Sequence, residues 1–135
     1  MDHETAMINA FVLPAKRARL IEFLRSPKHR GKALATLYHF RDLDTRVLIA
    51  IAPSEQHADA IATLLTQRGA PAECHLISTE PELDGRDLPL IDALRQIVGF
   101  GGGSLVSCVP GRLGYFEGES PKDRFILARE TPSGC

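Results

Sequence analysis

The sequence predicts an α/β fold in a single domain, residues 1–135, whose mixed sheet has a parallel centre, an antiparallel C-terminal hairpin edge and helices packed on it. Short apolar segments alternate with segments whose apolar residues recur at helical spacing. Residues 45–52 (TRVLIAIA) are almost continuously apolar, which is typical of a central parallel strand buried on both faces. Short polar connections near the C-terminus indicate antiparallel hairpins at one edge of the sheet.

The N-terminal half is expected to form a strand, two helices and the clearest strand of the chain. Residues 7–13 (MINAFVL) alternate loosely between apolar and polar positions and indicate a short strand. Pro14 opens a helix, and Ser26-Pro27 is a capping signal for a second helix over 27–40. The strand at 45–52 follows this second helix.

The C-terminal half continues the alternation of helices and strands. The helix over 55–68 is expected to end at Gly69, and together with strands 45–52 and 72–78 it suggests a right-handed crossover unit with parallel pairing. The remaining predicted elements are a polar loop at 79–87, a helix at 88–98, and strands at 105–109, 113–118 and 124–129. Residues 1–5 and 131–135 are expected to be disordered tails.

Composition favours a cytoplasmic protein without a membrane span. The longest apolar run, residues 47–52, is too short to cross a bilayer, and the acidic N-terminus does not resemble a secretory signal. Cys74 and Cys108 lie in apolar stretches, and no cysteine or histidine spacing matches a structural zinc site. The sequence therefore predicts no metal and identifies no cofactor.

Residues 98–119 hold seven of the chain's eleven glycines and pose the question of a phosphate-binding loop. Such a loop follows a strand and precedes a helix, whereas here a helix comes first and a strand follows. We interpret Gly99 as the left-handed residue that ends the 88–98 helix. Cys108 and Arg112 are separated by three residues, too few for the anion-wrapping loop of a cysteine phosphatase.

A candidate pocket follows from the expected parallel centre, because ligands gather outside the carboxyl ends of parallel strands. Asp84 and Asp87 are carboxylates that suit a magnesium ion, and a guanidinium suits a carboxylate or phosphate. His39 with a nearby carboxylate suits acid–base chemistry. A competing interpretation assigns Asp84 to a turn, Asp87 to a helix cap and His75 to a half-buried, hydrogen-bonded strand position. The candidate pocket residues are Asp84, Arg86, Asp87, His39 and Arg112.

Residues 14–32 carry seven basic side chains and one acid, a local charge of 7 − 1 = +6 in a chain whose net charge is −1. Such a patch attracts anionic partners. The sequence pI of about 6.5 argues against a dedicated nucleic-acid binder. The candidate anion-binding residues are Lys16, Arg17, Arg25, Lys28 and Arg30.

Three hypotheses of function remain open from the sequence. The favoured one is a binding module whose basic helices, residues 14–32, contact RNA or a phosphorylated ligand. The second is a small enzyme that uses Asp84, Arg86, Asp87 and His39 at the strand ends. The third is a structural domain that forms homo-oligomers through an exposed C-terminal edge strand at 124–129.

Overall fold

A computed structural model describes residues 2–36, 41–100 and 102–129, and six strands in it form one sheet. The sheet order is β1-β6-β5-β4-β2-β3, and each pair of neighbours runs antiparallel. The α/β class is confirmed, whereas the predicted parallel centre is wrong. The strands are β1 Leu48–Ala50, β2 Glu73–Ser78, β3 Asp87–Pro89, β4 Ser104–Val109, β5 Leu113–Glu117 and β6 Arg124–Ala128.

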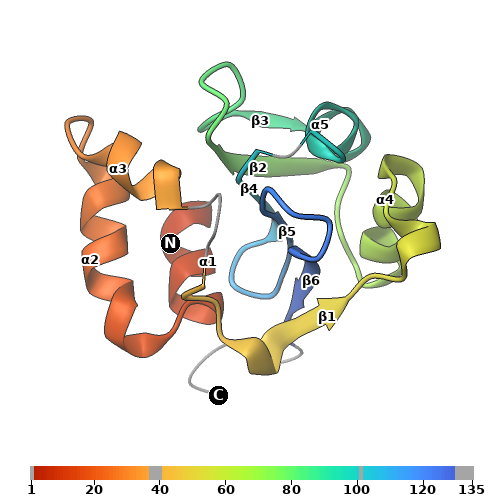
Figure 1. The fold of residues 1–135 in the computed structure, drawn as a ribbon, viewed down its shortest axis with the longest axis horizontal. Coiled ribbons are helices and arrows are strands. Elements are labelled where there is room, and N and C mark those ends of the chain that lie inside the picture. Colours follow the sequence, from red (N-terminus) through yellow and green to blue (C-terminus); the bar gives the residue numbers. More distant parts are fainter. Residues whose placement is uncertain (1, 37–40, 101, 130–135) are drawn as a thin grey trace.

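Helices cover both faces of this sheet (Figure 1). One face carries α1 (His3–Phe11), α2 (Pro14–Arg25) and α3 (Arg30–Ala35). The other face carries α4 (Ala58–Gln67) and α5 (Leu90–Ile97). Two short 3₁₀ helices, Thr45–Val47 and Pro53–Glu55, flank β1.

The segment that suggested a parallel centre, residues 45–52, is neither central nor buried on both faces, because it forms the short edge strand β1, whose residues are half-buried or exposed. In β4, residues 104–108 are all buried, because Leu105 faces the α1–α3 side while Val106 and Cys108 face the α4–α5 side. Burial on both faces therefore does not fix the direction of a strand, since the doubly covered strand β4 is antiparallel to both of its neighbours. β1 and β2 point the same way, but β4, β5 and β6 lie between them.

Several element boundaries also differ from prediction. Residues 7–13 lie mostly in α1 rather than in a strand, and residues 2–5 are ordered at the start of that helix. Among residues 27–36 the α-helix spans Arg30–Ala35, and residues 37–40 lie outside the described part of the chain. The predicted tail at 131–135 lies outside it as well.

The segment predicted as an exposed edge is internal. β6 pairs with β5 on one side and with β1 on the other, so the sheet edges are β1 and β3. The premise of self-association through residues 124–129 is therefore wrong. The end of α5 is as expected, since Gly99 follows Ile97 and Val98 with a φ of +87°.

α1 docks along one row of residues that crosses the sheet. His75, Ser107, Gly114 and Leu127 are successive cross-strand partners on this row. His3, Met7 and Phe11 recur every four residues and form the inner face of α1. Met7 lies against Gly114, where any side chain would collide with it.

Within the described residues no helix is long and apolar enough to span a membrane.

Candidate functional site

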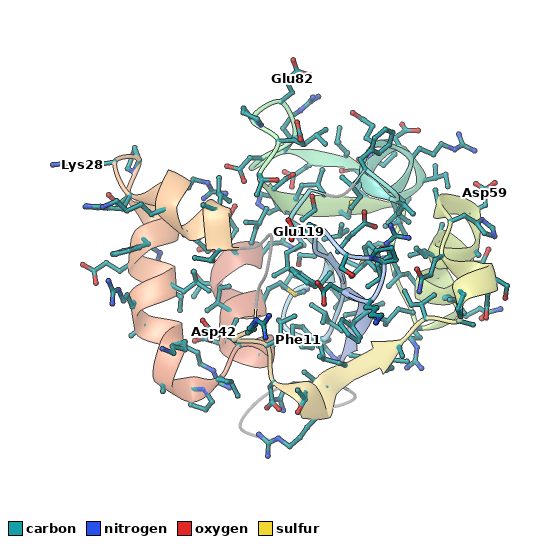
Figure 2. The ribbon with its side chains drawn as sticks, in the orientation of Figure 1. Phe11, Lys28, Asp42, Asp59, Glu82 and Glu119 are labelled. Carbon is teal, nitrogen blue, oxygen red and sulfur yellow. The ribbon has the colours of Figure 1, made fainter. Side chains whose placement is uncertain are left out.

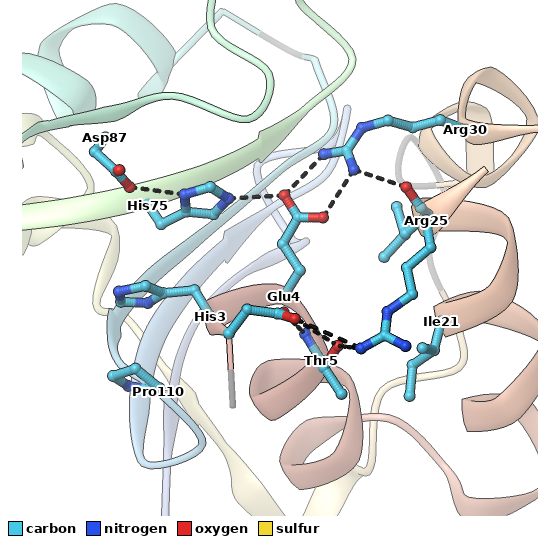
Figure 3. Close-up of a pocket in the computed structure, with 11 residues that line it drawn as sticks. His3, Glu4, Thr5, Ile21, Arg25, Arg30, His75, Asp87 and Pro110 are labelled. Carbon is cyan, nitrogen blue, oxygen red and sulfur yellow. Dashed lines mark hydrogen bonds and ion pairs between the residues drawn. The ribbon is translucent and has the colours of Figure 1, made fainter. Parts of the chain in front are cut away.

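A cavity of about 640 Å³ lies where the first turn of α1 meets the sheet and the end of α2 (Figure 3). The helix begins here because the Asp2 carboxylate accepts a hydrogen bond from the backbone N–H of Thr5, at 2.7 Å. This cap places His3 and Glu4 in the first turn, facing the sheet. The cavity also contacts Ile21, Leu24, Arg25, Arg30, His75, Asp87 and Pro110.

Five side chains beside the cavity form one continuous charge network, which we call the Glu4 network. Its members, in order of contact, are Asp87, His75, Glu4, Arg30 and Asp84. His75 contacts the Asp87 carboxylate through Nδ1 and the Glu4 carboxylate through Nε2, both at 2.7 Å. The Arg30 guanidinium donates to both oxygens of Glu4, at 2.7 and 2.9 Å. Figure 3 shows these contacts from Asp87 to Arg30.

Arg30 is the branch point of the network. Besides Glu4, it donates two hydrogen bonds to Asp84, at 2.7 and 2.9 Å, and one to the backbone carbonyl of Leu24. Its side chain is 21% exposed, and its carboxylate partners hold its pKa above the ordinary value. The guanidinium thus joins α3 to α1, to the end of α2 and to the β2–β3 connection.

Glu4 stays ionised in acid because of its two cationic neighbours. Burial raises the pKa of Glu4, but hydrogen bonds from His75 and Arg30, with the charge of Arg30, outweigh it and lower the pKa to about 2. A lowered carboxyl pKa stabilises the fold above the ordinary value of 4.5, and this contribution is lost as the pH falls toward 2.

This pKa shift predicts acid sensitivity that depends on Glu4. The free energy of unfolding of the wild-type chain should decrease between pH 4.5 and 2, because protonated Glu4 can no longer accept from both partners. Urea unfolding at a series of pH values measures this loss. Glu4→Gln should be less stable at neutral pH and should show a shallower decrease in acid. An equally steep decrease in Glu4→Gln would contradict the assignment.

The side chains in and next to the Glu4 network that could act in acid–base or nucleophilic catalysis are engaged in hydrogen bonds or buried. Both ring nitrogens of His75 are engaged, and the Ser107 hydroxyl, which contacts His3 Nδ1 at 2.6 Å, belongs to a fully buried residue. A nucleophile must reach substrate, so this Ser–His pair does not form a working nucleophile–base pair. Within the described residues, no group of three or more His, Cys, Asp or Glu side chains is arranged to hold a metal ion.

The described residues of the predicted pocket do not all gather at one rim, because antiparallel strands end alternately at opposite edges. Asp84 and Asp87 both belong to the Glu4 network, Asp87 through His75 and not as a helix cap. Arg86 is exposed and its side chain donates to the Glu82 carbonyl, at 3.3 Å. Arg112 lines a separate cavity of about 310 Å³ with Arg68 and Arg129, and His39 lies outside the described residues.

The predicted anion-binding residues do not share one environment. Arg30 is committed to the Glu4 network, and Arg17 donates from Nε to the Val12 carbonyl, at 2.8 Å. Arg25 forms an exposed ion pair with Asp2 at 3.6 Å. Lys28 projects away from the molecule (Figure 2). Lys16 lines a groove between α2 and α3.

This α2–α3 groove has a volume of about 440 Å³ and combines cations with an apolar floor. Lys16, Arg19 and Lys32 line it, and none of them forms an ion pair with a described residue. The Arg19 guanidinium lies over the Phe23 ring, 5.1 Å from its centroid, which fixes the position of this charge. The other lining residues are Ala15, Leu20, Phe23, Ala33, Thr36 and the single acid Asp42.

Sequence reasoning missed several members of both sites. His3 and Glu4 were placed in a disordered tail, and Arg19 and Lys32 were counted only in the net charge. A signal for the groove exists, since Lys16, Arg19, Leu20 and Phe23 follow helical spacing and must share one face of α2. His75 is a hydrogen-bonded, half-buried strand residue, as predicted.

Comparisons of the chain with protein-family models, with curated proteins and with solved structures found no match.

Proposed function

We propose that this protein binds a phosphate-bearing ligand in the α2–α3 groove, through Lys16, Arg19 and Lys32. The observation that carries the proposal is that three cations without a described ion-pair partner line one groove. A phosphate group offers several strong acceptors and a double negative charge, which suit two ammonium groups and a guanidinium. Asp42 is the one carboxylate that opposes this charge.

The groove suits a small phosphorylated ligand better than an RNA chain. Its volume of about 440 Å³ lies within the range of small-molecule pockets. The Phe23 ring is already engaged, because the Arg19 guanidinium lies over it and the His29 ring stacks on it with centroids 5.3 Å apart. Base stacking on aromatic rings contributes much of the affinity for single-stranded RNA. The chain's pI of about 6.5 also argues against RNA as the ligand, because nucleic-acid-binding domains are usually strongly basic.

Charge reversal in the groove tests this proposal. The double variant Lys16→Glu/Lys32→Glu should bind inorganic tripolyphosphate at least about tenfold more weakly, since each charge-assisted contact contributes about 1.5–3 kcal/mol. Isothermal titration calorimetry measures the affinity, which should also fall as sodium chloride is added. A single-stranded oligouridylate is titrated in parallel, and we expect it to bind more weakly than tripolyphosphate.

The matched control is Lys28→Glu/Lys122→Glu. It changes the net charge by the same amount at two exposed residues that do not line the groove. This control should retain at least about half of the wild-type affinity, because the charges it reverses lie outside contact distance of the ligand. If both double variants weaken binding equally, the protein attracts anions only through its overall charge, and the groove is not a site.

A further inference from the structure

We propose that the first turn of α1 is a pH-operated latch, which docks on the sheet when His75 carries two ring protons and His3 carries one. The latch residues are His3 and Glu4 on α1 and His75 and Ser107 on the sheet. This inference rests on the Glu4 network and is independent of the α2–α3 groove. Release of the latch would open the wall of the 640 Å³ cavity that the first turn provides.

The protonation state of His75 follows from its hydrogen bonds. Both ring nitrogens lie 2.7 Å from carboxylate oxygens, Nδ1 from Asp87 and Nε2 from Glu4. An ionised carboxylate only accepts hydrogen bonds, so both contacts are satisfied only when both nitrogens carry protons. A neutral imidazole has one N–H and would leave a lone pair facing one of the carboxylates. Loss of the second proton therefore breaks one of the two contacts.

His3 requires the opposite state. Its Nδ1 contacts the buried Ser107 hydroxyl at 2.6 Å, and its ring stacks on His75 with centroids 5.5 Å apart and planes 15° apart. The neutral His3 ring can form the hydrogen bond with Ser107, and it stacks on the His75 imidazolium without charge repulsion. A proton on His3 would place two positive rings face to face, which is unfavourable.

The charges that surround the two rings come from the start of α1, from β3 and the connection before it, and from α2 and α3. Asp2 and Glu4 lie on α1, Asp87 on β3, Asp84 on the β2–β3 connection, Arg25 on α2 and Arg30 on α3. β4 contributes the uncharged Ser107, and the turn after β4 contributes Pro110. The charges of Asp87 and Asp2 favour a second proton on His3, and Oδ1 of Asp87 is engaged by His75.

The directions of the pKa shifts agree with this geometry. The hydrogen bond to Glu4 outweighs burial and raises the pKa of His75, whereas burial and the charge of His75 lower the pKa of His3. The stabilisation of the docked first turn by His75 is complete below pH 6.5, the ordinary pKa of histidine. It is lost as the pH rises through the raised pKa of His75. The stabilisation of the docked first turn by His3 is complete above pH 6.5 and is lost as the pH falls through the lowered pKa of His3. Docking is therefore strongest near pH 6.5 and weaker on both sides.

Hydrogen exchange tests the latch in the full chain. Protection factors of the α1 amides should be highest at about pH 6.5 and at least about threefold lower at about pH 5 and 8.5, while β4 amides keep theirs. Histidine ring resonances followed by NMR provide a second measurement. His75 should titrate above 6.5 and His3 below it. Flat α1 protection across this range, or the reverse order of titration, would overturn the proposal.

Three variants assign the two limbs of the pH profile. His75→Gln should remove the alkaline loss of α1 protection, since the amide does not titrate. His3→Phe should remove the acid loss, since the ring still stacks on His75 without acquiring charge. His57→Asn is the control, because His57 caps α4 on the other face of the sheet and Asn retains the cap. Both limbs should persist in this control, and their persistence in the first two variants would contradict the latch.

Discussion

Arg30→Met is expected to lower the free energy of unfolding by about 2–4 kcal/mol, because it leaves carboxylates unpaired in a largely buried position. Methionine retains the volume of the side chain but donates none of the five hydrogen bonds that Arg30 gives to Glu4, Asp84 and Leu24. Glu4 and Asp84 are 20% and 14% exposed, so water replaces the guanidinium only in part. Urea unfolding at neutral pH measures the change.

Arg25→Met is the matched control for this prediction. Arg25 lines the same cavity, but its side chain is 66% exposed and its ion pair with Asp2 is long, at 3.6 Å. Exposed ion pairs contribute little, so this variant should lose no more than about 0.5 kcal/mol. Equal losses in the two arginine variants would show that the Glu4 network does not stabilise the fold.

Gly114→Ala is expected to destabilise the fold by about 3 kcal/mol, the upper part of the range for an overpacked core. A Cβ atom at this position would overlap both the Met7 methyl group and the Val106 carbonyl oxygen. The methionine side chain can move, but the carbonyl belongs to the backbone of β4, which is fixed between β2 and β5. The added methyl group therefore strains the pairing of β5 with β4 and displaces the Met7 side chain of α1.

Gly31→Ala is the control at a glycine with open surroundings. Nothing lies within 4 Å of a Cβ at this position, which is exposed and lies inside α3. Alanine is the better helix former, so this variant should be more stable by about 0.5–1 kcal/mol. Thermal or urea unfolding of both variants checks the opposite signs. A tolerated Gly114→Ala would mean that the Val106 carbonyl and Met7 do not approach Gly114 as closely as described.

The sequence predicted the later strands well and the sheet topology poorly. Strands over 105–109 and 124–129 agree with β4 and β6 to within one residue at each end. Local apolar patterns fix which face of an element is buried, but they carry no information on which strands pair. The crossover from β1 through α4 to β2 therefore looked like adjacent parallel pairing, although three strands separate the two.

The Glu4 network was beyond sequence reasoning because its contacts are remote in the chain. Glu4 meets Arg30 across 26 positions and His75 across 71, and no local spacing connects such residues. The start of α1 was within reach, since Asp2 is a strong N-cap residue and only the proximity of the terminus argued for disorder. The expected parallel centre wrongly brought Arg112 to the same rim as Asp84 and Asp87, whereas in the antiparallel sheet Arg112 lines a separate cavity.

Chemical-shift mapping tests the central claim, ligand binding in the α2–α3 groove, most directly. Inorganic tripolyphosphate is titrated into the ¹⁵N-labelled full chain. The account predicts that the saturable shifts concentrate on amides at 15–20 and 32–36, which carry the lining residues of the groove. Shifts that concentrate instead around Arg68, Arg112 and Arg129, or that spread without saturating over all exposed basic residues, would contradict it.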